Sequence, residues 1–320
     1  MRSRLFPALG LVSDIGYGLW GMGGWSGSND DESIAALERA VELGCTFFDT
    51  ALAYGQGHSE RLLAQVLARH RTRKLIVATK IPPANMKWPA VASYALEDVF
   101  PRDHIRRATE TSLENLGLTA LDLQQFHVWT DTWATDDRWQ RAVDDLKREG
   151  LIRAFGISVN RWEPANVLRA LETGLVDSVQ VVYNVFDQAP EDALFPACRA
   201  RKIAVIARVP FDEGSLTGTM HRGMTWPSGD WRNLYFTRDK LNETLDRVDG
   251  LRSDLPPGLP LPELALRFIL SNPDVTTVIP GMRRPRHVDF NLSISDTGPL
   301  DPALMNRLRR HRWDRSYVVV

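Results

Sequence analysis

The sequence predicts an α/β protein, a (β/α)8 or TIM barrel that forms a single domain over residues 1–320. Two observations predict it: short apolar strand patterns alternate with helical patterns along most of the chain, and no shift in composition marks a domain break. Such alternation requires a mostly parallel sheet with right-handed crossovers. Eight strands of this kind close most simply into a barrel, and barrels of this length occur as one domain.

Each expected strand is a short apolar run, and 46–48, with a threonine and two phenylalanines, is a clear example. Helical spacing of apolar residues precedes most of these runs, and a glycine ends the helix at Gly44, Gly117, Gly150 and Gly174. We expect strands at 15–18, 46–49, 74–80, 121–127, 152–158, 178–183, 203–208 and 276–279. We expect helices at 31–43, 59–70 (with Ser59 as its cap), 105–116, 139–146, 167–171, 191–201 and 301–312.

The composition is that of a globular protein, with 43% hydrophobic and 25% charged residues. Lysine and arginine number 39 against 40 aspartate and glutamate, so the net charge of −1 argues against nucleic acid or a membrane surface as a partner. The chain shows no signal-peptide pattern and no uninterrupted apolar stretch near ~18 residues, which predicts a soluble, cytoplasmic protein. The two cysteines, Cys45 and Cys198, are expected to be buried free thiols.

The segment from Gly16 to Gly21 matches the spacing G-x-G-x-x-G, which is typical of dinucleotide-binding folds. In those folds the glycines open a helix directly, whereas here more glycines follow and the helix begins only near Asp31. We therefore interpret these glycines as allowing the backbone to approach a ligand closely.

Polar side chains stand where three of the expected strands end. Asp49 ends the second strand, Lys80 the third and His127 the fourth, while Tyr54 lies in the glycine-rich loop after Asp49. The carboxyl ends of barrel strands meet on one face, so these four should converge. A buried Lys–Asp pair is often merely structural. Beside a phenol, however, a lysine lowers the phenol's pKa from about 10 and makes it a usable proton donor.

Two roles complete this grouping. Asp49 would hold Lys80 charged, and His127 would orient a carbonyl oxygen next to Tyr54. The other histidines show no metal-ligand spacing, so we expect no metal. The same Asp49–Tyr54 stretch could also be an ordinary strand–loop–helix junction without catalytic function.

Seven segments resemble, in order, the motifs of the aldo-keto reductase family. They are Phe48–Glu60, Val77–Lys80, Gln125–His127, Gly156–Ser158, Gln180–Asn184, Gly214–Gly218 and Val278–Arg284 through Asn291. The resemblance, over roughly residues 5–295, implies an NADP(H)-dependent oxidoreductase that reduces an aldehyde or ketone to an alcohol, reversibly. It implies a catalytic tetrad of Asp49, Tyr54, Lys80 and His127, with Tyr54 as proton donor and a small-molecule carbonyl or alcohol as substrate.

Two alternatives remain at this point. The family also includes nicotinamide-binding regulatory or sensor subunits with little turnover, and an intact tetrad does not exclude slow turnover. A barrel aldolase or isomerase could instead use Lys80 to form a Schiff base, but that lysine would have to lack its aspartate and phenol partners.

The resemblance also implies a set of cofactor contacts. The carboxamide would lie against Ser158, Asn160 and Gln180. The pyrophosphate would lie on the loop 210–217, which includes Pro210, Gly214, Ser215 and Leu216, and the adenosine phosphate against Gly281, Arg283, Arg284, His287 and Asn291. The basic cluster at 283–287 is either a solvated helix start or a clamp for a 2′-phosphate, and the second interpretation favours NADP(H) over NAD(H).

The chain departs from the family pattern at three positions. Val159 intervenes before Asn160, and Phe290 replaces a frequent glutamate before Asn291. Arg208 stands where many members place a tyrosine that stacks on the nicotinamide. Its charge would oppose the positive oxidised ring, so we expect reduced NADPH to be favoured over NADP+.

Ten tryptophans are many for this length. Trp20, Trp88 and Trp129 each follow an expected strand end, which favours an apolar, aromatic substrate pocket, although each could simply pack a loop. The loops 82–103, 128–136 and 209–237 should decide the substrate, and the last of them is long enough to fold over a ligand. The sequence does not predict an oligomeric state.

Overall fold

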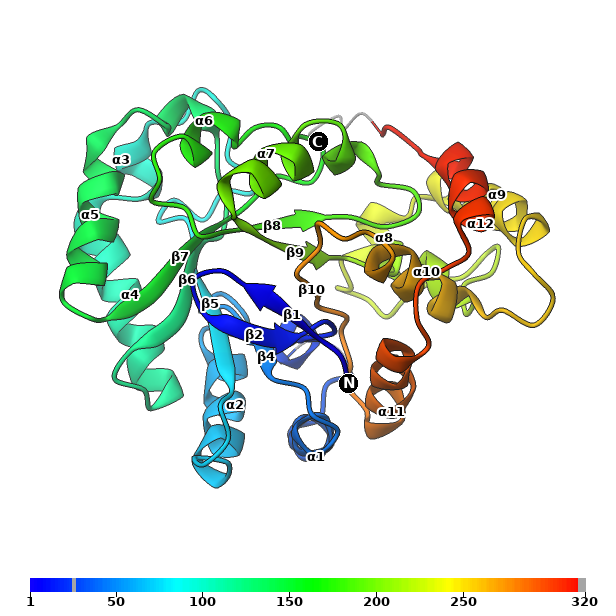
Figure 1. The fold of residues 1–320 in the computed structure, drawn as a ribbon, viewed down its shortest axis with the longest axis horizontal. Coiled ribbons are helices and arrows are strands. Elements are labelled where there is room, and N and C mark those ends of the chain that lie inside the picture. Colours follow the sequence, from blue (N-terminus) through cyan, green and yellow to red (C-terminus); the bar gives the residue numbers. More distant parts are fainter. Residues whose placement is uncertain (25–26, 316–320) are drawn as a thin grey trace.

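The fold is an eight-stranded parallel barrel surrounded by helices, as predicted (Figure 1). The computed structural model describes residues 1–24 and 27–315. The strands pair in sequence order, and the isolated bridges Ile15–Val278 and Gly18–Gly281 join the first strand to the last. The barrel strands are β3 (Tyr17–Gly18), β4 (Phe47–Asp49), β5 (Ile76–Ile81), β6 (Leu121–Phe126), β7 (Ile152–Ser158), β8 (Ser178–Val182), β9 (Ala204–Arg208) and β10 (Thr277–Val278).

Helices lie outside the barrel, and every expected helix is present, most with slightly different bounds. The helices are α1 (Asp30–Glu42), α2 (His58–Arg69), α3 (Leu96–Val99), α4 (Arg102–Leu116), α5 (Asp137–Arg148), α6 (Leu168–Leu171), α7 (Leu194–Arg201), α8 (Arg232–Tyr235), α9 (Arg238–Ser253), α10 (Leu261–Leu270), α11 (Pro285–Ser293) and α12 (Pro302–Leu308). Turns of 3-10 helix are η1 (Trp20–Met22), η2 (Asp131–Trp133), η3 (Ala189–Glu191), η4 (Asp212–Thr217), η5 (Ile294–Asp296) and η6 (Arg309–His311).

Local sequence explains how these helices begin and end. In α5 the side chain of Asp136 accepts a hydrogen bond from the amide of Arg138 at the amino end, and one face buries Trp139 and Leu146 against the barrel. At the end of α4, Gly117 takes the left-handed conformation, with φ +64°, that glycine adopts without steric cost. These features fix where the chain turns back toward the next strand.

The predicted cap of α2 is wrong. Gly57, not Ser59, stands at the amino end of that helix, and Ser59 is its second residue. The Ser59 hydroxyl instead lies 2.8 Å from Thr50 Oγ1 and donates to the carbonyl oxygen of Leu19 at 3.3 Å. Ser59 therefore ties the loops after β3 and β4 together beneath the site.

A β-hairpin that the sequence did not predict precedes the barrel. Strands β1 (Ser3–Phe6) and β2 (Gly10–Ser13) pair antiparallel, and this hairpin lies across the barrel strands in Figure 1. Phe6, Leu9 and Val12 are buried in one apolar cluster with inward-facing barrel residues such as Leu123 and Ile206. The hairpin therefore closes the amino-terminal end of the barrel.

The long connection after β9 has its own small apolar cluster, made by Trp226, Phe236, Leu241 and Leu245. At the start of this connection, Val209, Asp212 and Glu213 have φ angles of +56°, +43° and +56°, a strained backbone conformation for residues with a side chain. Both cysteines are buried free thiols, as predicted, and burial raises the pKa of each to about 12. Within the described residues, no helix is long and apolar enough to cross a membrane.

Candidate active site

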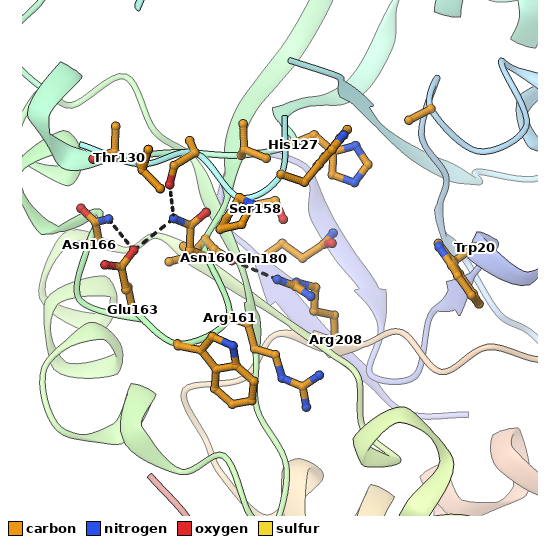
Figure 2. Close-up of a pocket in the computed structure, with 18 of the residues that line it drawn as sticks. Trp20, His127, Thr130, Ser158, Asn160, Arg161, Glu163, Asn166, Gln180 and Arg208 are labelled. Atoms are coloured by element: carbon orange, nitrogen blue, oxygen red, sulfur yellow. Dashed lines mark hydrogen bonds between the residues drawn. The ribbon is translucent and has the colours of Figure 1, made fainter. Parts of the chain in front are cut away.

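A cavity of about 1110 Å³ opens at the carboxyl ends of the strands, the end opposite the hairpin. Tyr54, His127, Ser158, Gln180 and Arg208 all contribute to its wall. Figure 2 shows Ser158, Gln180 and Arg208 near its centre, with Trp20 on the side opposite Asn160 and Glu163. The cavity thus lies where barrel strands place the residues that the sequence singled out.

The structure brings the four predicted catalytic residues together. The ammonium nitrogen of Lys80 lies 2.5 Å from Asp49 Oδ1, 2.7 Å from the carbonyl oxygen of Thr50 and 3.4 Å from Tyr54 Oη. The ring of His127 meets that of Tyr54 edge-on, with 5.7 Å between centroids. Lys80 is fully buried, so its charge depends on these oxygen atoms.

Burial controls the protonation of this group. It raises the pKa of Tyr54 above its ordinary value, and the lowering by Lys80 and Arg208 does not overcome it. Lys80 therefore lowers the pKa of the phenol as predicted, but burial has the larger effect and the net pKa is raised. Burial lowers the pKa of Lys80, but Asp49 and Tyr54 outweigh it and raise that pKa.

His127 is neutral. Burial, with Lys80 and Arg208 nearby, holds its pKa well below the usual value. Its Nδ1 atom is buried and has no hydrogen-bond partner within the described chain. A neutral ring beside a phenol can donate a hydrogen bond to a carbonyl oxygen without placing a second cation there.

The predicted carboxamide contacts differ in how they are oriented. Ser158 and Gln180 line the cavity, and the Gln180 amide donates to Asp49 Oδ2 at 2.8 Å. The Asn160 amide donates instead to the carbonyl oxygen of Ala90 at 2.9 Å and to Glu163 at 3.1 Å. Asn160 lines the cavity wall, but its NH2 group is already engaged by the neighbouring loops.

The predicted pyrophosphate loop runs through η4 and carries unexpected carboxylates. Pro210, Ser215 and Leu216 are buried, Gly214 has φ +105°, and the Ser215 hydroxyl donates to Asp212 Oδ2 at 2.8 Å. Asp212 and Glu213, inside the same loop, form ion pairs with Arg161 at 2.9 and 2.5 Å.

Arg315 also pairs with Asp212, at 2.8 Å, and with Asp187, which lies 128 residues away in the sequence. We call Arg161, Asp187, Asp212, Glu213 and Arg315 the ion cluster. Sequence reasoning missed it, since no local pattern links residues so far apart. The cluster holds the strained loop 209–217 against the cavity wall.

The predicted adenosine-phosphate contacts lie in the connection that follows β10 and on α11 itself. Gly281 forms the bridge to Gly18, and Asn291 is buried on α11. Arg284 stands at the amino end of α11 with its Nε 3.5 Å from Glu32. Partial burial lowers the pKa of His287, and the three neighbouring arginines add to that effect. A side chain at Gly21 would meet the stem of Arg283, with a Cβ 2.7 Å from its Cδ, so this glycine leaves room for the arginine.

Of the three tryptophans predicted for a substrate pocket, two line the cavity and the third does not. Trp20 and Trp88 line the cavity and are 44% and 43% exposed. Trp129 is fully buried and stacks on Phe126 with 6.0 Å between centroids, because its ring turns outward between the strands and α5. The cavity is also lined by Thr130, Trp231 and Tyr235, which lie in loops expected to decide the substrate. Arg161, Trp162, Asn166 and Arg315 line it as well, and sequence reasoning did not assign these four to the pocket. Among the described residues no group of His, Cys, Asp or Glu is placed to hold a metal ion.

Comparison with known proteins gives the class of this barrel. Residues 14–312 match the sequence model of the aldo/keto reductase family, and the chain belongs to that family. It is therefore an oxidoreductase. It is 29% identical to the aldo-keto reductase YhdN of Bacillus subtilis over 285 residues, which covers 87% of this chain and 83% of that protein. It is 27% identical to an NADH-specific methylglyoxal reductase of Escherichia coli over 318 residues, which covers 93% of this chain and 94% of that protein.

Solved structures agree with this assignment. The holo form of the aldo-keto reductase AKR11C1 from Bacillus halodurans superposes with a TM-score of 0.79 at 25% identity, over 99% of this chain and 98% of that one. The apo form of the same protein superposes with a TM-score of 0.71. The glycerol dehydrogenase AKR11B4 from Gluconobacter oxydans also gives 0.79 at 25% identity, over 99% and 98%.

Proposed function

We propose that this protein, as one domain over the whole chain, uses NADPH to reduce an aldehyde or ketone to the alcohol, reversibly. The observation that carries the proposal is the contact of the Tyr54 phenol with the Lys80 ammonium, itself paired with Asp49, on the wall of the cavity. This arrangement supplies a proton donor at the cavity wall and, behind it, a fixed and buried positive charge.

The proposed chemistry divides between cofactor and protein. A bound reduced nicotinamide supplies the hydride. Tyr54 gives its proton to the carbonyl oxygen, and Lys80 stabilises the phenolate that remains. Neutral His127 orients the oxygen toward Tyr54, and Asp49 with the Thr50 carbonyl holds Lys80 in place. A positioned general acid typically contributes ~10²–10⁴-fold to the rate.

The basic cluster supports NADP(H) over NAD(H). Named relatives differ in cofactor: the Escherichia coli enzyme is NADH-specific, while a Schizosaccharomyces pombe relative is named for NADP(+). This chain's own residues therefore carry the choice. Arg283, Arg284 and Arg286 surround the amino end of α11, whose cap makes no side-chain hydrogen bond to the first turn. Guanidinium groups gathered at the amino end of a helix fit a phosphate.

The direct test combines NADPH binding, followed by fluorescence, with NADPH oxidation by a panel of aldehydes and ketones. We expect binding with turnover, and loss of turnover in Tyr54→Phe with little change in affinity. Tyr183→Phe is the matched control, because that buried phenol bonds to Glu191 outside the cavity. NADPH binding without any turnover would favour a sensor subunit. Trapping of a substrate on Lys80 by borohydride would favour a Schiff-base enzyme. Absence of NADPH binding would overturn the cofactor assignment.

A further inference from the structure

Gln125, inside the barrel, has no role in the mechanism above. We propose that it is a positioning residue: its amide fixes the second oxygen of Asp49 and thereby the orientation of Lys80 toward Tyr54. This inference rests on the proposed reductase function and names a residue that the function needs but that does not touch the reacting atoms.

Strand register places Gln125 next to the catalytic lysine. On β6 its Cα pairs with that of Lys80 on β5 and with that of Gly156 on β7. Its side chain points into the barrel and is fully buried. The preceding residue, Gln124, is equally buried but points outward, where its amide donates to Thr109 of α4 at 3.1 Å.

Three donors from three strands converge on the Asp49 carboxylate. Lys80 occupies Oδ1 at 2.5 Å, while Gln125 and Gln180 both donate to Oδ2, at 3.2 and 2.8 Å. The Gln180 amide also lies 3.4 Å from Gln125 Oε1, so the two glutamines hold each other. A carboxylate shielded from water needs such hydrogen-bond donors, and its contact with Lys80 in turn holds the buried ammonium in place.

The barrel also leaves space for Gln125. A Cβ atom added at Gly156 would lie 3.1 Å from Gln125 Cγ and 2.4 Å from Ser178 Oγ. The φ angle of Gly156 is not in the left-handed region, so packing and not backbone conformation requires a glycine here. Because Gly156 of β7 has no side chain, Gln125 has room to reach across the barrel to Asp49 at the end of β4.

Loss of the Gln125 amide has two consequences. Asp49 Oδ2 keeps Gln180 as its remaining donor, and Gln180 loses the longer of its two hydrogen bonds but keeps Asp49 as acceptor. The change therefore acts mainly on the proton donor, through Asp49 and Lys80. A purely structural glutamine would affect stability without altering how the reaction depends on pH.

The first test compares Gln125→Met with Gln124→Met. Each replaces one fully buried, hydrogen-bonded glutamine of the same strand by an apolar side chain of similar size. We expect kcat of Gln125→Met to fall roughly ten- to hundredfold, as for a lost hydrogen bond to a charged group, with a displaced pH profile. Gln124→Met should lose comparable thermal stability but keep kcat and the pH profile of the wild type.

A second variant separates position from charge. In Gln125→Glu the neutral acid can donate to Asp49 as the amide does, whereas the ionised form repels it. We expect kcat near that of the wild type at low pH and a progressive loss as pH rises, a limb absent from the wild type. Gly156→Ala, which crowds Ser178 as well as Gln125, should also lower kcat. If Gln125→Met does not fold, the pH dependence of Gln125→Glu decides the question.

The proposal is overturned if the Gln125 variants match Gln124→Met in kcat and pH profile to within about twofold. Intrinsic fluorescence titration with NADPH gives an independent measure, and we expect the dissociation constant of Gln125→Met to change little. An inactive wild type would instead contradict the proposed function, so the two failures are distinguishable.

Discussion

The Arg208 guanidinium donates through Nη2 to the carbonyl oxygen of Val159 at 3.0 Å, and no carboxylate within the described residues forms an ion pair with it. Its neighbour Arg161 has three carboxylate partners. Burial lowers the pKa of Arg208, and Arg161 lowers it further, but a guanidinium remains charged at neutral pH. Arg208 therefore places on the cavity wall a positive charge that has no direct ion-pair partner among the described residues, although Glu213 and Asp49 act on it from a distance.

The first prediction concerns this charge. In Arg208→Tyr we expect the preference for NADPH over NADP+ to fall roughly tenfold, or ~1.4 kcal/mol, which a unit charge ~10 Å away supplies at an effective dielectric near 20. The measurement is the ratio of the two dissociation constants at fixed ionic strength. Arg153→Tyr, at an arginine already paired with Asp122, is the control. An unchanged ratio in Arg208→Tyr would show that the Arg208 charge does not set the preference for NADPH over NADP+.

The second prediction separates two tryptophans. Trp88 packs edge-on against His127, with 4.6 Å between centroids, at the half-exposed cavity wall. We expect Trp88→Ala to raise KM for apolar aldehydes with little loss of stability. Trp129→Ala should instead destabilise the fold by about 3–5 kcal/mol, because it removes a fully buried ring. Denaturant unfolding and steady-state kinetics on both variants check this prediction. Equal effects on KM would show that Trp129 contributes to the substrate pocket after all.

The third prediction tests the phosphate site. Replacing Arg283 or Arg284 by alanine should raise the dissociation constant of NADPH roughly tenfold and leave that of NADH nearly unchanged. The difference should shrink as salt increases, since exposed charges are screened. Arg309→Ala, an exposed arginine paired with Glu191, provides the comparison. Equal losses for both cofactors would show that the cluster does not read the 2′-phosphate.

The fourth prediction concerns pH and stability. The pKa of His127 is held well below its usual value by burial, with Lys80 and Arg208 adding to the effect. Below pH ~6.5, His127 therefore binds a proton in the unfolded chain but not in the folded one. The free energy of unfolding consequently falls as pH falls toward the pKa of His127 in the folded protein. His127→Gln should show a shallower decline over this range, by at most ~1.4 kcal/mol per pH unit. Parallel curves in urea titrations would refute this.

Much of the barrel could be predicted from sequence because its elements are local. Val77 and Ile157 lie in short apolar runs that predict buried strands, and Gly117 and Gly150 mark where helices end. The hairpin was missed because each of its strands has four residues and Pro7 interrupts the pattern between them. Its stability comes from packing on the barrel, which no short window of sequence contains.

The candidate site divides in the same way. Asp49, Lys80 and His127 were predictable because the ends of parallel strands must meet. The direction of a side chain just beyond a strand end is set by tertiary packing, which is why Trp129 does not line the cavity. Arg315 reaches the cavity from the far end of the chain through ion pairs that leave no local signal.

The hairpin at the amino-terminal end has a consequence for how molecules move through the protein. Phe6, Leu9 and Val12 fill that end of the barrel, so the chamber at the other end is blind. A nicotinamide and a carbonyl compound would therefore share the one cavity that Trp20 and Trp88 help to line. Whichever of them lies deeper has to arrive first and depart last, so the shape of the chamber imposes an order on binding and release.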